Sequence, residues 1–133
     1  MAVMPVRPPS AIAKASPEQL AKYFEAKLSA ELGPHNVKRL LDMGGRALAI
    51  LDVRSREGYA QGHVPGAIHL PFEELAARVK ELPKNKEIIC YCWNVTCTLS
   101  TKAAYILAKR GYRVKELLGG IEAWKNAGFP IER

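Results

Sequence analysis

The sequence lacks the features that mark membrane, secreted and nucleic-acid-binding proteins. No stretch approaches the roughly 18 consecutive apolar residues of a membrane-spanning helix, and prolines interrupt residues 1–9, which contain no apolar signal-peptide segment. Lys and Arg (20) outnumber Asp and Glu (13), but the basic residues are dispersed and form no basic run. We therefore expect a cytoplasmic protein that binds neither membranes nor nucleic acid.

Cysteine is also scarce. The three cysteines, Cys90, Cys92 and Cys97, are too few and odd in number for a disulfide framework, which favours a reducing compartment. The 133 residues are enough for one domain with its own core. The net charge of +7 suits a small anionic substrate, because a diffuse positive field raises its local concentration. We expect the chemistry to need neither a metal nor a cofactor.

The chain divides into three predicted segments. Residues 1–15 are rich in proline and alanine and are expected to form a flexible arm. Residues 16–44 are expected to form N-terminal helices, the first from Pro17 to Leu32, because Ser16 and Gln19 form a capping box. The apolar stripe of this helix is typical of one that covers a sheet, although a lid or a dimer face would show the same pattern.

Residues 45–133 alternate between predicted strands and helices. The apolar runs 47–53 and 88–92 have the length and composition of strands buried on both faces. Helices are expected over 72–82, after residue 98, and over 121–127, with a further strand over 112–117. This alternation predicts an α/β fold, a three-layer sandwich whose central, mostly parallel sheet has helices on both faces.

Cys92 is the candidate nucleophile. It ends a buried strand, at the edge where open α/β sheets bind ligands, and a helix begins shortly afterwards. The N–H groups and positive dipole end of such a helix stabilise a thiolate, which can lower a cysteine pKa from about 8.5 to roughly 3.5–7.5. Cys90 lies inside the strand and is expected only to pack.

Three polar residues are expected to support this site. Asp52 and Arg54 follow the first buried strand and are expected to pair with each other or with the loop backbone, because buried charges need partners. His63 lies between Gly62 and Val64 and is expected to be a hydrogen-bonded turn residue rather than a general base.

Three separated sequence motifs, which together span residues 47–129, resemble a single rhodanese domain. We therefore expect residues 45–133 to form a rhodanese-like domain. The pieces occur in that family's order: Asp52-Val53-Arg54 with Glu57-Gly58-Tyr59 and Gly62-His63-Val64-Pro65-Gly66-Ala67, then the strand, Cys92 loop and helix, and finally Gly119-Gly120-Ile121-Glu122-Ala123-Trp124.

The resemblance implies a sulfurtransferase. Cys92 would take a sulfane sulfur from an anionic donor such as thiosulfate and pass it, from a persulfide, to a thiol or a cyanide-like acceptor. A sulfur-accepting protein and a homodimer are possible partners.

The predicted substrate-binding loop departs from the family pattern. The usual loop is shorter, with a glycine, one or two basic residues and a single cysteine, whereas this one has no glycine and no charge. It consists of Trp93, Asn94, Val95, Thr96, Cys97 and Thr98. Thr98 stands where the related phosphatases have an arginine, which argues against phosphate chemistry. Anion stabilisation is therefore expected from the N–H groups of residues 94–98 and from the nearby hydroxyl groups.

Cys97 leaves the function open between alternatives. It could be a second thiol that cycles with Cys92 as a thiol–disulfide device, or that resolves the Cys92 persulfide if the two Cα atoms lie within about 7 Å. It could equally be structural. A third possibility is a catalytically weak rhodanese-like module that only binds a partner.

Overall fold

A five-stranded parallel sheet forms the centre of the molecule. The computed structural model describes residues 14–133, so the predicted flexible arm over residues 1–15 lies almost wholly outside the described residues. The strands are β1 (Glu31–Leu32), β2 (Leu48–Asp52), β3 (Ile68–His69), β4 (Glu87–Tyr91) and β5 (Val114–Leu117). Their order is β1-β5-β4-β2-β3, and each neighbouring pair is parallel. The predicted α/β fold class is therefore confirmed.

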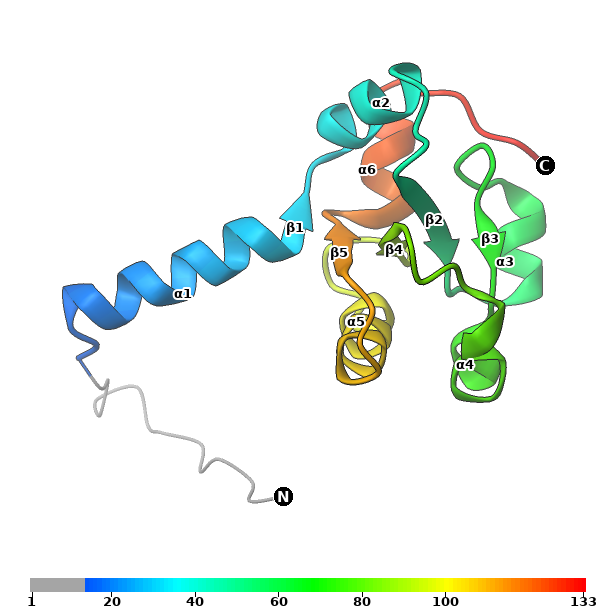
Figure 1. The fold of residues 1–133 in the computed structure, drawn as a ribbon. Coiled ribbons are helices and arrows are strands. Elements are labelled where there is room, and N and C mark those ends of the chain that lie inside the picture. Colours follow the sequence, from blue (N-terminus) through cyan, green and yellow to red (C-terminus); the bar gives the residue numbers. More distant parts are fainter. Residues whose placement is uncertain (1–13) are drawn as a thin grey trace.

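Helices cover both faces of this sheet (Figure 1). The helices of the described residues are α1 (Pro17–Ala30), α2 (Pro34–Asp42), α3 (Arg56–Gln61), α4 (Phe72–Arg78), α5 (Leu99–Lys109) and α6 (Gly120–Asn126), with a short 3₁₀ helix η2 (Val79–Glu81) after α4. Helices α2 and α6 lie on one face, and α4 and α5 lie on the other (Figure 1). Figure 1 places α3 beside the β3 edge.

Two hydrophobic clusters fill the spaces between these layers because side chains alternate along each strand. In β4, Ile88 and Cys90 face the cluster under α4 and α5, whereas Ile89 and Tyr91 face the cluster under α2 and α6. Cys92 continues this alternation on the α5 side and is 1% exposed. The strand thus carries Cys92 to the rim of the sheet with its side chain directed toward the α5 layer.

Helix α1 does not cover the sheet, so that expectation is wrong. It extends away from the domain (Figure 1), and none of its residues is buried. The capping box at Ser16 forms as predicted, but the helix ends at Ala30 instead of Leu32. Glu31 and Leu32 instead pair with β5 as an edge strand, because the sheet offers their backbone hydrogen-bond partners.

Candidate functional site

The site lies at the carboxyl edge of the sheet, where the loop from Cys92 to Thr98 joins β4 to α5. Strand β4 ends at Tyr91, so that Cys92 is the first residue beyond it. Parallel strands bring their carboxyl ends to the same edge, and the segments after β2 and β5 therefore meet this loop. Their contacts with the loop fix its path.

Helix α6 holds the first part of the loop. The N–H groups of Ile121 and Glu122 donate to the carbonyl oxygens of Cys92 and Trp93, each at 3.0 Å. Gly120 makes this approach possible, because a Cβ there would lie 2.5 Å from the Cys92 oxygen and its φ is +61°. The glycine turn recognised in the sequence therefore anchors the backbone of the candidate nucleophile.

Trp93 packs inward against the segment that follows β2. The Arg54 guanidinium lies 4.6 Å from the centroid of the indole ring. A Cβ on Gly58 would come within 2.7 Å of the same ring, so only glycine leaves room for it. The indole is 38% exposed, and its packing against Arg54 and Gly58 indicates that it shapes the loop.

The predicted Asp52–Arg54 pair forms and is fully buried. Asp52 accepts hydrogen bonds from the Arg54 backbone N–H (2.9 Å), Nε (3.1 Å) and Nη2 (2.7 Å), and from the Tyr91 hydroxyl (2.6 Å). Arg54 Nη2 also donates to the Gly62 carbonyl at 2.7 Å. Burial, followed by the Asp52 charge, raises the pKa of Tyr91, so its hydroxyl stays a donor. This network holds the Arg54 guanidinium in place against the Trp93 ring.

His63 is the hydrogen-bonded turn residue that the sequence predicts. Its Nδ1 lies 2.9 Å from the Tyr59 carbonyl oxygen, and its ring stacks on the Tyr59 ring with centroids 3.7 Å apart. His69 stacks on the same tyrosine at 4.4 Å and bonds the Arg54 carbonyl oxygen at 2.7 Å. Both histidines therefore support the loop after β2.

Asn94 forms a hydrogen-bonded turn in the second part of the loop. Its side-chain oxygen accepts hydrogen bonds from the Thr96 N–H (3.1 Å) and hydroxyl (2.8 Å), and its carbonyl accepts from the Cys97 N–H (3.1 Å). Of the N–H groups of residues 94–98, which are expected to stabilise an anion, those of Thr96 and Cys97 are therefore used inside the loop. Val95 projects to the surface with 75% exposure.

Cys97 pairs with Cys92. The two form a disulfide with Cα atoms 6.4 Å apart, inside the 7 Å limit set by the sequence argument. Cys90 is the free cysteine of the described chain and is fully buried, its thiol 3.4 Å from the Ser100 carbonyl oxygen. Burial, and next the Glu116 carboxylate, raise the pKa of Cys90, which keeps it a thiol.

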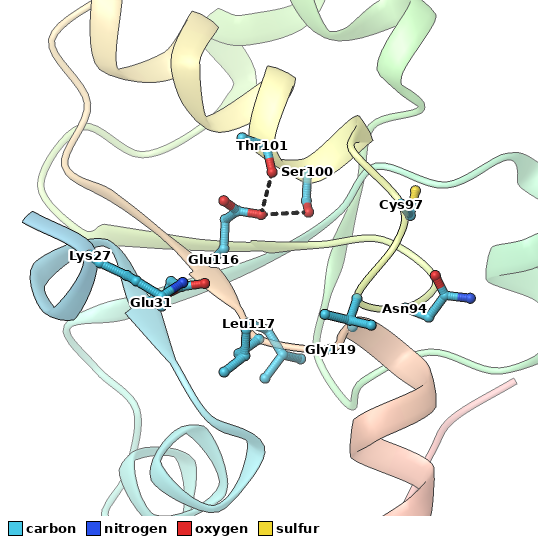
Figure 2. A pocket seen from close by; sticks show the side chains of 12 residues that line it. Lys27, Glu31, Asn94, Cys97, Ser100, Thr101, Glu116, Leu117 and Gly119 are labelled. Atoms are coloured by element: carbon cyan, nitrogen blue, oxygen red, sulfur yellow. Dashed lines mark hydrogen bonds and ion pairs between the residues drawn. The ribbon is translucent and has the colours of Figure 1, made fainter. Parts of the chain in front are cut away.

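A cavity of about 210 Å³ opens beside Cys97 (Figure 2). It lies between the loop, the first turn of α5, the end of β5 and the end of α1. Glu116 projects into it and accepts hydrogen bonds from the hydroxyls of Ser100 and Thr101, both at 2.9 Å (Figure 2). Lys27 also borders the cavity, paired with Glu31 at 2.7 Å.

Sequence reasoning missed Glu116. Residues 112–117 alternate like an ordinary strand, and the one available signal is a carboxylate near the carboxyl end of a parallel strand. Within residues 14–133, no group of three His, Cys, Asp or Glu side chains is arranged to hold a metal ion. The described part of the chain also has no helix long and apolar enough to cross a membrane.

A parallel α/β sandwich with a cysteine loop at its carboxyl edge defines the class of fold. Residues 33–127 match the sequence model of the rhodanese-like domain. The chain therefore belongs to the rhodanese-like domain family.

The similar proteins include a transcriptional regulator and a sulfurtransferase. The HTH-type transcriptional regulator Rv0324 of Mycobacterium tuberculosis is 39% identical over 85 residues, 64% of this chain, which spans only 38% of that regulator. The thiosulfate sulfurtransferase GlpE of Actinobacillus pleuropneumoniae is 31% identical over 77% of this chain and 92% of its own length. Among solved structures, the BH2092 protein of Bacillus halodurans superposes with a TM-score of 0.79 at 36% identity, covering 88% of this chain and 86% of that one.

Proposed function

We propose that the protein is a sulfurtransferase in which Cys92 carries the transferred sulfur. The observation that supports this most is the position of Cys92, directly after a central parallel strand, with its carbonyl held by α6. Family membership and the sulfurtransferase relative make sulfur transfer the chemistry that best fits this position. Cys90 lies inside β4 with its thiol directed at the Ser100 carbonyl oxygen, whereas Cys92 lies beyond the strand at the start of the loop, so we assign the role to Cys92.

The proposed reaction has two half-reactions. The Cys92 thiolate attacks the outer sulfur of thiosulfate, the bond between the two thiosulfate sulfurs breaks, and sulfite leaves with the bonding electron pair. A thiol or cyanide acceptor then attacks the outer sulfur of the Cys92 persulfide. The acceptor leaves with the sulfur, and the Cys92 thiolate is restored.

The loop offers limited stabilisation to an anionic donor. Among described residues, the backbone N–H groups of Asn94, Val95 and Thr98 donate to no protein acceptor, so they remain available to a bound anion. The loop carries no cationic side chain, and Glu116 borders the adjoining cavity. We therefore propose a small anionic sulfur donor such as thiosulfate, used with lower affinity than by a loop that carries arginine.

We place the protein in a reducing compartment, with a thiol as the acceptor. The cycle needs Cys92 as a free thiolate, which favours the reducing cytoplasm. The acceptor is a thiol, either a small molecule or a cysteine of a sulfur-accepting protein. A homodimer is compatible with the exposed apolar stripe of α1, which includes Tyr23, Phe24 and Leu28.

The first prediction is that Cys92→Ser abolishes sulfur loading, because the hydroxyl that replaces the thiol cannot form a persulfide. Reduced protein is incubated with thiosulfate and its intact mass is measured before and after cyanide. Wild type should gain one sulfur atom that cyanide removes, whereas Cys92→Ser should gain none.

Cys90→Ala is the matched control, since it removes a cysteine two positions away and should still load. Loading by Cys92→Ser would refute the assignment. If folded wild-type protein gains no sulfur from any donor tested, the binding-module alternative is favoured instead.

A further inference from the structure

We propose that Cys97 is a resolving thiol that reduces the sulfur carried by Cys92 to sulfide and closes the Cys92–Cys97 disulfide. This inference depends on the proposed persulfide at Cys92. It adds a second outcome to sulfur transfer: the loaded sulfur leaves as sulfide even without an external acceptor.

The geometry of the pair is the first support. The Cα atoms of Cys92 and Cys97 are 6.4 Å apart, within the usual range of about 4.4–6.8 Å for bonded cysteines, and the two sulfurs are joined. Only five positions of sequence separate them. A sulfur on one side chain is therefore within reach of the other without rearrangement of the sheet.

Contacts other than the disulfide also keep the two cysteines close. The N–H groups of Ile121 and Glu122 hold the backbone at the Cys92 end of the loop. At the other end, the Cys97 N–H donates to the Asn94 carbonyl at 3.1 Å, and this turn directs the chain back toward Cys92. These hydrogen bonds involve no sulfur, so they do not depend on the disulfide. The reduced pair then reacts as neighbours, with an effective concentration on the order of millimolar or above.

The resolving step balances in atoms and electrons. The Cys97 thiolate attacks Sγ of the Cys92 persulfide, the bond from this Sγ to the outer sulfur breaks, and the outer sulfur leaves as hydrosulfide. The Cys97 sulfur supplies the electron pair of the new bond and is oxidised by one electron, the outer sulfur leaves with the pair of the broken bond and is reduced by one, and the Cys92 sulfur keeps its oxidation state. The product is the disulfide that the structure contains.

The environment of the pair indicates how it is reset. Cys92 is 1% exposed, whereas Cys97 is partly exposed and borders the 210 Å³ cavity beside α5 (Figure 2). A small thiol entering this cavity therefore meets Cys97 first. Its attack on the Cys97 sulfur releases Cys92 as a thiolate, and a second thiol frees Cys97, so that two thiols are oxidised to one disulfide.

The Cys92–Cys97 pair makes sulfur loading depend on the supply of thiols. While external thiols are abundant, Cys92 is repeatedly released and reloaded, and the net product is sulfide. When thiols are depleted, the disulfide occupies Cys92 and loading stops. The supply of thiol reductant thus decides whether the protein accepts sulfur.

The test follows one loading event in the full-length chain. Fully reduced, desalted protein is loaded with thiosulfate under nitrogen, and no thiol is added. Cyanide-releasable sulfur, free sulfide and alkylation of the unfolded protein are measured over time. Wild type should lose its cyanide-releasable sulfur as up to one equivalent of sulfide appears, and only Cys90 should then be alkylated.

Cys97→Ser should load but keep its cyanide-releasable sulfur at least about tenfold longer than wild type, because no intramolecular thiol remains. Cys90→Ala, the matched control, should lose it at the wild-type rate. Two outcomes would overturn the resolving role of Cys97 and leave the proposed function intact. One is loss of cyanide-releasable sulfur at the same rate in Cys97→Ser and wild type. The other is wild-type protein in which Cys92 and Cys97 are still alkylated after sulfide appears. Failure of both wild type and Cys97→Ser to load would instead refute the proposed function.

Discussion

Asp52 and Arg54 show how single residues far from the nucleophile in sequence determine the site. Arg54 is 1% exposed and has two roles: its guanidinium pairs with Asp52, and its face supports Trp93. A buried guanidinium is tolerated only while a carboxylate compensates its charge. The stability of the domain and the shape of the loop should therefore depend on the same pair.

The second prediction is that Asp52→Asn costs about 3–5 kcal/mol of unfolding free energy, because it leaves the buried Arg54 cation without a counter-charge. Urea unfolding followed by tryptophan fluorescence measures the loss. Asp42→Asn is the control, because Asp42 pairs with Lys38 at the surface, where an ion pair contributes little. Similar losses for the two variants would show that the buried pair has no special role.

At the level of elements, the central strands and the helices around them were predictable, but α1 and β1 were only partly so. Strands β2 and β4 appear in the sequence as apolar runs bounded by polar residues, because both of their faces are buried. The apolar period of α1 continues through Leu32, and nothing local indicates that Glu31 and Leu32 pair with β5. Edge pairing depends on a distant strand, which periodicity does not report.

The loop was predictable in position but not in conformation. Cys92 was placed correctly because it ends an apolar run, whereas the turn at Asn94 depends on one side chain bonding to Thr96 two residues later. The pairing of Cys97 also follows from this turn and from the contact with Gly120. The free N–H groups of the loop could not be identified without these contacts.

The third prediction concerns α1. Leu28 is 80% exposed, so Leu28→Ala should change the unfolding free energy by no more than about 0.5 kcal/mol. Leu75→Ala is the same substitution in α4 at a fully buried position and should cost about 2–5 kcal/mol. Urea unfolding compares the two variants. A comparable loss in Leu28→Ala, together with a lower sedimentation coefficient, would show that α1 packs against a second copy in solution.

On the scale of the whole molecule, two electrostatic effects act against each other at the site. The net charge of +7 attracts small anions over a range set by the ionic strength, roughly 10 Å at 0.1 M salt. Glu116 places a negative charge at the cavity beside the loop, where it repels them. The overall field therefore concentrates an anionic donor near the protein, and the local carboxylate opposes its final approach.

The last prediction is that Glu116→Gln increases kcat/KM for thiosulfate by about two- to tenfold at low salt, because it removes the repulsion while the amide oxygen can still accept from the Ser100 and Thr101 hydroxyls. The gain should shrink as salt screens the charges. Steady-state kinetics over a range of ionic strengths provides the measurement. Glu18→Gln changes the net charge equally but lies in the first turn of α1, and it should have little effect. An equal gain in Glu18→Gln would assign the effect to net charge, and no gain in Glu116→Gln would show that the donor approaches Cys92 from outside this cavity.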